Sequence, residues 1–178
     1  HAGPSCASGT CAIDTCTADA DCDSATDLKC HAGRCCEKAW YDTNLEQEDG
    51  CECHVPEDPG PFCADAKNLG YLTEDFDSVT YSGALPYEGD VNTLRFSTDE
   101  HGWFSPHVIR VVFSSTDPTL SACVQVREGG DCPTNQDATR CGGYLTFEDE
   151  NSTFLVKITR QSGAAPTCIP YTVAVSHH

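Results

Sequence analysis

The chain contains no methionine and only ten lysine and arginine residues among 178. It also has no apolar run close to the roughly 20 residues that a helix needs to cross a bilayer, so no membrane span is expected. Against the ten bases stand 28 acids, which gives a formal net charge of −18. A field of that sign repels phosphate backbones and anionic lipid. Nucleic acid and membrane surfaces are therefore excluded as expected partners, whereas divalent cations suit the charge.

Large apolar side chains are scarce in the first sixty residues, where only six occur. Six such side chains bury too little apolar surface to offset the conformational entropy lost when that stretch becomes ordered. Cysteine is abundant instead, with ten residues up to position 63 and four beyond it: Cys6, Cys11, Cys16, Cys22, Cys30, Cys35, Cys36, Cys51, Cys53, Cys63, Cys123, Cys132, Cys141 and Cys168. The even counts predict that all fourteen pair, as five disulfides in the first part and two in the second.

Disulfides at this density indicate an oxidising compartment. The sequence starts at His1 and has no initiator methionine, so we expect that a signal peptide has been removed. The protein is therefore expected to be secreted and to act outside the cell or on its surface.

Prolines divide the chain. Three of them fall in residues 55–61, and we interpret residues 55–62 as a stiff linker between a disulfide-rich module, residues 1–54, and a second domain, residues 63–178. In the second domain, apolar residues alternate with others at Leu94 and Phe96, at Ala122, Val124 and Val126, at Phe154, Val156 and Ile158, and at Tyr171, Val173 and Val175. This period of two is typical of strands, and runs near 79–85, 107–113 and 143–147 add more. Without helical stretches between them, seven or eight strands predict an antiparallel, jelly-roll-like β-sandwich.

Four segments of the second domain resemble the bacterial pre-peptidase C-terminal domain. They are Tyr81-Ser82-Gly83-Ala84-Leu85, residues 89–96, residues 153–158 and Tyr171-Thr172-Val173-Ala174-Val175. Two positions depart from the family pattern, because Asn92 stands in place of its second aspartate and Leu94 in place of an aromatic residue. The resemblance implies a non-catalytic sandwich that accompanies secreted enzymes, some of which bind calcium or matrix polymers.

The first part resembles short cysteine modules of exported myxobacterial proteins. The resemblance lies in the spacing of cysteines and aspartates over residues 16–36 and in Asp49-Gly50-Cys51-Glu52-Cys53. A looser resemblance to knottins comes from the adjacent Cys35 and Cys36 followed by the Cys51-x-Cys53 pair. None of these resemblances names a ligand, and the spacing does not reveal which cysteines pair.

Two groups of oxygen-bearing side chains are candidates for calcium. Asp19, Asp21, Asp23 and Asp27 occupy the first, third, fifth and ninth positions of an EF-hand-like loop, although Ser24 and Cys30 replace its glycine and final glutamate. Glu88, Asp90 and Asn92 precede a predicted strand, where a calcium-binding relative would use them. The alternatives are a solvated acidic loop for the first group and simple turn chemistry for the second. Calcium is the only cofactor expected, and the fold does not require it.

Other chemistries are less well supported by the pattern. His1 would bind copper only with a second, well-placed histidine, and Cys51, Cys53 and His54 would bind zinc only as reduced thiolates. No nucleophile elbow, zinc-protease helix, phosphate loop or dinucleotide fingerprint is present. Tyr87, Trp103 and Phe104 would suit a sugar-stacking platform or, equally, edge cover.

We therefore predict a secreted, non-catalytic structural or adhesive protein that assembles with copies of itself into a fibre or surface layer. A carbohydrate- or matrix-binding accessory module of a secreted enzyme is the first alternative. A small secreted hydrolase, or a copper enzyme that uses His1, is the second.

Overall fold

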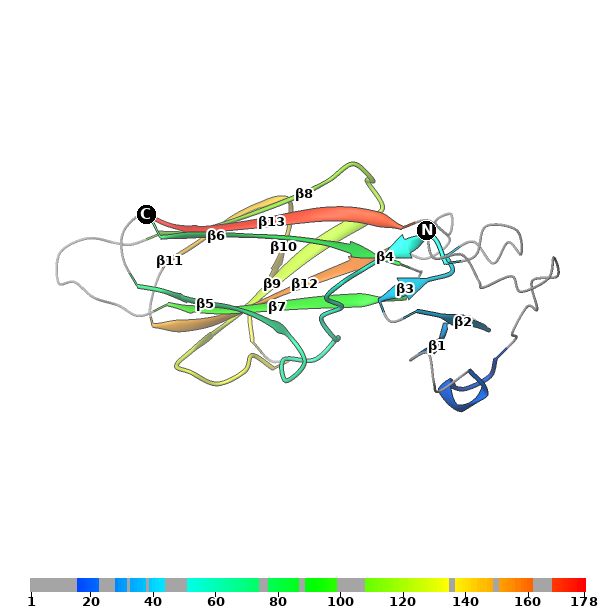
Figure 1. Ribbon diagram of the computed structural model, residues 1–178. Helices are drawn as coiled ribbons and strands as arrows, with labels where there is room; N and C mark the ends of the chain where they lie inside the picture. Colours follow the sequence, from blue (N-terminus) through cyan, green and yellow to red (C-terminus); the bar gives the residue numbers. More distant parts are fainter. Residues whose placement is uncertain are drawn as a thin grey trace.

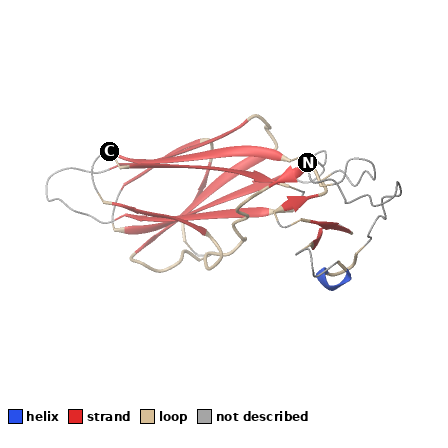
Figure 2. Cartoon of the chain, viewed as in Figure 1, coloured by secondary structure: helices blue, strands red, loops and turns tan. Residues whose placement is uncertain are grey.

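The computed structural model describes residues 16–22, 28–31, 33–37, 39–43, 51–73, 77–86, 89–98, 108–134, 137–148, 151–161 and 168–178 (Figure 1). In this part of the chain nearly all regular structure is β, and the exception is one turn of 3-10 helix, η1 (Asp19–Asp21) (Figure 2). Within the same residues, no helix has the length and apolarity to cross a membrane.

Two sheets form the sandwich that the alternation of apolar residues predicted. One has five strands in the order β10-β9-β12-β7-β5, and the other has four in the order β11-β8-β13-β6. The strands are β5 (Lys67–Leu72), β6 (Ser78–Leu85), β7 (Val91–Thr98), β8 (Val108–Ser115), β9 (Leu120–Glu128), β10 (Thr139–Cys141), β11 (Tyr144–Glu148), β12 (Ser152–Arg160) and β13 (Ile169–His177). The predicted fold class is thereby confirmed, with two strands, β5 and β10, that the sequence pattern did not reveal.

The core lies between the sheets and consists of the alternating residues. Phe96 on β7 and Phe154 on β12 are fully buried and stack with ring centroids 4.7 Å apart, while Phe147 meets Phe154 edge-on at 5.6 Å. From the other sheet, Tyr171 and Val173 of β13 are buried against the same cluster. Each such side chain contributes about 1.5–3 kcal/mol by leaving water, so burial of this core is the main stabilising contribution to the sandwich.

One strand departs from the antiparallel expectation. β5 pairs with β7 in parallel, with an irregular register between Asn68 and Tyr71, where Gly70 has a φ of +97°. The reason is topological: between β5 and β7 the chain passes through β6, which belongs to the other sheet. Crossing to that sheet and back reverses the chain twice, so β7 runs in the same direction as β5.

Two small ribbons precede the sandwich and lie at one end of it (Figure 1). β1 (Lys29–His31) pairs with β2 (Arg34–Cys36), and β3 (Trp40–Tyr41) pairs with β4 (Cys53–His54). They contain little apolar surface, and three disulfides hold this region: Cys16–Cys30, Cys22–Cys35 and Cys36–Cys51.

The expected division into five disulfides before residue 63 and two after it is wrong. Cys53 bonds to Cys168 and Cys63 bonds to Cys132, so two bridges join the early part of the chain to the sandwich, and Cys123–Cys141 is internal to it. An even count on each side allows pairing across the boundary as readily as pairing within it. None of the twelve described cysteines is free, whereas Cys6 and Cys11 lie outside the described residues.

The proline-rich segment packs on the sandwich. Val55 is buried with Tyr41 and Cys53, and this cluster contacts Ala84 of β6 and Cys168. Further along, Glu57 forms an ion pair with Lys67 of β5. The segment that was interpreted as a linker is thus held by apolar and ionic contacts and is flanked by the disulfide-bonded Cys53 and Cys63. The boundaries 1–54, 55–62 and 63–178 stay a prediction.

Candidate functional site

A cluster of polar side chains closes the sandwich at the end where the proline-rich segment packs. Asp90 and Asn92 lie two residues apart at the start of β7, so both face the other sheet. Asn92 is fully buried, and its Nδ2 donates hydrogen bonds to the carbonyl of Ala84 (3.1 Å) and to the hydroxyl of Tyr171 (2.9 Å). The side chain of Asn92 therefore ties β7 to β6 and β13 across the core.

The proline-rich segment adds a second carboxylate to this cluster. The hydroxyl of Tyr41, on β3, donates a hydrogen bond to Oδ2 of Asp58 at 2.7 Å. One residue earlier, the carbonyl of Glu57 accepts a hydrogen bond from the hydroxyl of Tyr81, on β6, at 3.2 Å. Segments far apart in the sequence thus meet at this site.

Burial controls the protonation of the cluster. It raises the pKa of Asp90 to about 7, the charge of Asp58 adds to this, and a hydrogen bond from the backbone N–H of Val91 opposes it. Burial also raises the pKa of Tyr81 to about 12, with Glu57 and Asp58 adding to the shift. At neutral pH Asp90 therefore holds its proton far more readily than an exposed aspartate does, and the phenol of Tyr81 keeps its proton.

Two buried oxygens in this cluster have no hydrogen-bond partner in the described part of the chain, namely Oδ2 of Asp90 and Oδ1 of Asn92. Carboxylate and amide oxygens are ligands that calcium accepts. The structure thus brings together two of the three residues that the sequence pointed to, whereas Glu88 lies outside the described residues. Asp58, Tyr41 and Tyr81 were missed, because no spacing pattern connects them to Asp90.

The EF-hand-like candidate is different, because its described carboxylates serve the local fold. Oδ2 of Asp21 accepts hydrogen bonds from the backbone N–H (2.7 Å) and hydroxyl (2.8 Å) of Thr17, and these bonds lower the pKa of Asp21. Asp19 accepts the backbone N–H of Cys30 at 2.9 Å and pairs with Lys29 Nζ at 3.3 Å. Asp23 and Asp27 lie outside the described residues, so calcium binding at this loop stays a prediction.

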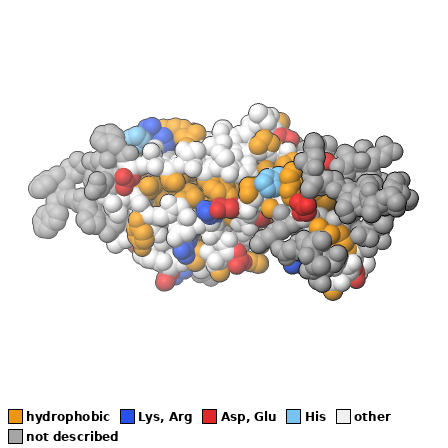
Figure 3. All heavy atoms as spheres, viewed as in Figure 1, with side chains coloured by type: hydrophobic (Ala, Val, Ile, Leu, Met, Phe, Trp, Pro, Cys, Tyr) orange, Lys and Arg blue, Asp and Glu red, His pale blue; other side chains and the backbone are white. Residues whose placement is uncertain are grey.

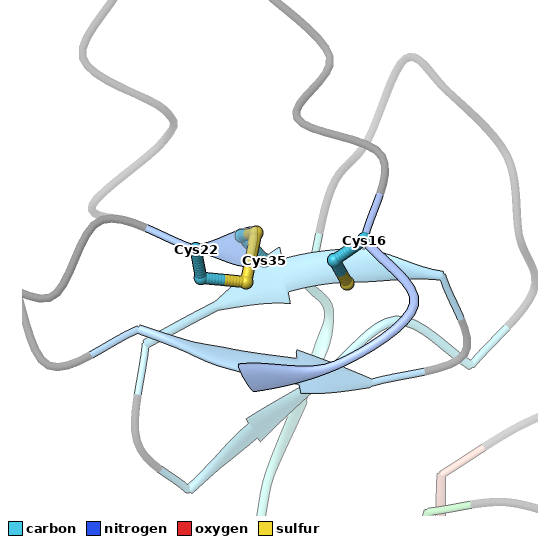
Figure 4. Close-up of side chains that lie close together, drawn as sticks. All are labelled: Cys16, Cys22 and Cys35. Carbon is cyan, nitrogen blue, oxygen red and sulfur yellow. A yellow bond between two sulfur atoms is a disulfide. The ribbon is translucent and has the colours of Figure 1, made fainter. Parts of the chain in front are cut away.

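Sulfur atoms form the one group of three or more metal-ligand side chains in the described residues. The Sγ atoms of Cys16, Cys22 and Cys35 lie within 4.8 Å of one another (Figure 4). All three are bonded in disulfides, Cys16 to Cys30 and Cys22 to Cys35, and a disulfide sulfur is not the thiolate that zinc requires.

The other residues considered for zinc or copper are engaged in disulfides or ring stacking, or lie outside the residues that the structure describes. Cys51 and Cys53 are both disulfide-bonded, and the ring of His54 stacks on Trp40 with centroids 4.7 Å apart. His1 lies outside the described residues, as do Tyr87, Trp103 and Phe104.

Three large apolar side chains are exposed on the described surface, namely Phe62 (68 %), Tyr71 (67 %) and Tyr144 (59 %). Tyr144 lies on the outer strand β11, and the guanidinium of Arg110 sits 5.6 Å from the centre of its ring. Phe62 and Tyr71 belong to the stretch that contains the proline-rich segment and β5. These three aromatic residues are spread over different strands and loops, and the sugar-stacking platform of Tyr87, Trp103 and Phe104 stays a prediction.

Comparisons with known proteins give likenesses of fold only. No protein-family model matches the chain, and no curated protein does. Among solved structures, the chain is similar to PliG from Aeromonas hydrophila, a periplasmic lysozyme inhibitor of g-type lysozyme (15 % identity over 64 % of this chain and 99 % of that one, TM-score 0.39). It is also similar to the pre-peptidase C-terminal domain of a Bacillus anthracis collagenase (12 % identity over 62 % of this chain and 93 % of that one, TM-score 0.40). A third similar structure is a Yersinia pseudotuberculosis mitogen (15 % identity over 57 % of this chain and 86 % of that one, TM-score 0.37). At this level of identity the site residues have no established counterparts.

Proposed function

We propose that this chain is an exported, non-catalytic structural or adhesive protein that acts outside the cell by associating with copies of itself. The observation that carries the proposal is the pair of bridges Cys53–Cys168 and Cys63–Cys132, which span 115 and 69 residues of sequence. They fasten the ribbons and the proline-rich segment to the sandwich, and such bonds persist only in an oxidising compartment. A body held in this way presents a fixed surface, which repeated contacts between identical copies require.

Calcium at the Asp90 and Asn92 site is a second element of the proposal. The support is the pair of buried oxygens without a partner among the described residues, together with the net charge of −18. A bound cation would satisfy both oxygens and neutralise the repulsion between Asp90 and Asp58. The fold does not depend on it, because the apolar side chains of the core pack against one another without a cation.

Light scattering and electron microscopy of the full chain, at low and at molar salt and over a range of concentrations, test self-association. Oligomers that grow with concentration support the proposal, and a chain that stays monomeric under all these conditions contradicts it. Retention of a monomer on insoluble polysaccharide would favour the carbohydrate-binding alternative. Hydrolysis of a polysaccharide that is lost in Asp90→Asn would favour the hydrolase alternative, because Asp90 is the acid with a suitably raised pKa.

A further inference from the structure

Each sheet ends in two outer strands, and three of the four carry features that discourage a further strand from pairing. β10 has only three residues, and β5 is irregular and begins with Lys67. On β11 the guanidinium of Arg140 donates a hydrogen bond to the outward carbonyl of Thr146 at 3.3 Å. The fourth, β6, has eight residues in unbroken register with β13, and it contains neither a charged residue nor proline.

The hydrogen-bonding groups on the free side of β6 can be assigned from its pairing. The carbonyl of Asp77 accepts a hydrogen bond from the backbone N–H of His177, at the end of β13, so odd-numbered residues of β6 face β13. In an antiparallel strand the N–H and C=O groups of alternate residues point to opposite sides, so those of Ser78, Thr80 and Ser82 point away from the sheet. No hydrogen bond joins these groups to another residue that the structure describes.

The sequence of this edge is self-complementary. From Ser78 to Ser82 it reads hydroxyl, apolar, hydroxyl, apolar, hydroxyl, and this order is the same in both directions from Thr80. If two copies meet in antiparallel register about Thr80, Ser78 of each lies opposite Ser82 of the other, and Val79 lies opposite Tyr81. The three outward residues of each strand then donate one hydrogen bond and accept one. The two apolar pairs are of the aromatic and β-branched kind that stabilises neighbouring strands.

We propose that two copies of this chain pair edge to edge through β6, about a twofold axis at Thr80, so that their four-stranded sheets become one continuous sheet. This inference rests on the proposed self-association and names the surface that performs it. Val79 and Tyr81 are partly buried already, and hydrophobic side chains form a band across the face of the molecule seen in Figure 3. In the proposed pair, strand β6 of the second copy covers the apolar side chains along this edge.

The net charge of −18 opposes the approach of a second copy, but the edge itself limits this repulsion. The centre of the edge carries no charge, so copies with a net charge of −18 meet there without like charges facing one another. Acids flank the contact at both ends, Asp77 before β6 and Glu57 beside Tyr81. Salt screens the repulsion between them, so pairing of copies strengthens as salt rises, whereas binding of a basic strand would weaken.

Cysteine cross-linking tests the register. In the proposed pair the two Thr80 residues lie opposite each other, at a Cα separation of about 5.5 Å that a disulfide spans. The two Ser78 residues are offset by four positions, about 13 Å along the strand. Under mild oxidation Thr80→Cys is therefore expected to give a covalent dimer, in which mass spectrometry finds the two peptides that contain position 80 joined by a disulfide. The equally exposed Ser78→Cys control is not expected to cross-link.

A charge variant tests the contribution of the edge to affinity. Thr80→Lys places two like charges face to face on the axis, and we expect the dissociation constant to rise about tenfold. Ser114→Lys makes the same change on an exposed position of β8, inside the sheet, and should leave the dissociation constant unchanged. Since both variants reduce the net negative charge equally, a nonspecific charge effect would move them together. Circular dichroism and melting curves confirm that each variant is folded.

The outcomes separate the two proposals. If the wild type associates but Thr80→Cys cross-links no better than Ser78→Cys, or Thr80→Lys associates as well as Ser114→Lys, the β6 inference is overturned and self-association through another surface stands. A wild type that is monomeric at all salt concentrations overturns both, and leaves β6 as an edge for a different protein.

Discussion

Asp90→Asn is expected to stabilise the folded chain, and to do so more strongly as the pH rises. The folded state holds the proton of Asp90 more tightly than the unfolded state, since burial and Asp58 raise its pKa from 3.8 to about 7. Below about pH 4 both states are protonated and the group is neutral in both. Between about pH 4 and pH 7 the unfolded chain loses this proton while the folded chain keeps it, so the stability of the wild type falls across that window and then levels off.

The magnitude follows from the same two values. A change from 3.8 to about 7 corresponds to about 4 kcal/mol, at about 1.4 kcal/mol for each tenfold change in proton affinity. Because Asp90 is only partly buried, solvent screening reduces this to about 1–3 kcal/mol. For a chain of this length each kcal/mol shifts the melting temperature by about 2–4 °C, so the expected gain at high pH is roughly 2–12 °C.

Thermal unfolding of wild type and variant at about pH 4 and about pH 8 measures the effect. The asparagine keeps an oxygen for the N–H of Val91 and has no proton to lose, so the difference in melting temperature should be larger at pH 8. Asp131→Asn, at an exposed position, is the control and should show the same difference at both pH values. An Asp90→Asn difference that is independent of pH, or largest at pH 4, would refute the reasoning.

Four further outcomes are expected. Thiol titration of the denatured, unreduced chain should find no free sulfhydryl, and two or more would contradict complete pairing. Replacing both Cys53 and Cys168 by serine should cost about 4 kcal/mol in denaturant unfolding, because the intact Cys63–Cys132 bridge shortens the loop from 115 residues to about 46. Opening the 13-residue loop of Cys22 and Cys35 should cost about 3 kcal/mol, and a larger cost for the smaller loop would count against the loop-entropy argument. Asp137→Ala should lower the melting temperature at neutral pH but not in strong acid, because hydrogen bonds from Thr134 lower the pKa of Asp137 and their stabilisation is lost as the pH falls. Millimolar calcium should raise the melting temperature more than magnesium does, and identical curves with and without chelator would rule the site out.

Strands with strict alternation could be predicted from the sequence. Leu94 and Phe96, or Phe154 and Val156, are buried where the period of two places them, because one face of each strand must leave water. β5 and β10 could not, because neither shows alternating burial: β5 has an irregular register and the three residues of β10 are all exposed. The positions of these outer strands depend on the neighbours with which they pair. The alternation of apolar residues indicates which face of a strand is buried, but it does not indicate which strand lies beside it.

The candidate site around Asp90 and Asn92 was likewise only partly predictable from the sequence. Asp90 and Asn92 are oxygen-bearing residues close together in the sequence, so the pattern alone could single them out as candidate ligands. That they face the other sheet depends on where β7 begins. Asp58 and Tyr41 reach them only because the proline-rich segment folds back onto β6, and the raised pKa of Asp90 follows from that burial. A desolvated carboxylate has no signature in the sequence.

The sequence by itself determined that the protein is disulfide-rich and built on a β-sandwich, and it indicated an oxidising compartment, because composition and periodicity report on the redox environment and on which faces are buried. Only the tertiary structure decided that Cys53 and Cys63 cross to Cys168 and Cys132, and that β6 is left as a regular, uncharged edge. Both depend on which segments meet in space, and residues 115 positions apart become neighbours only once the two sheets have closed around their common core.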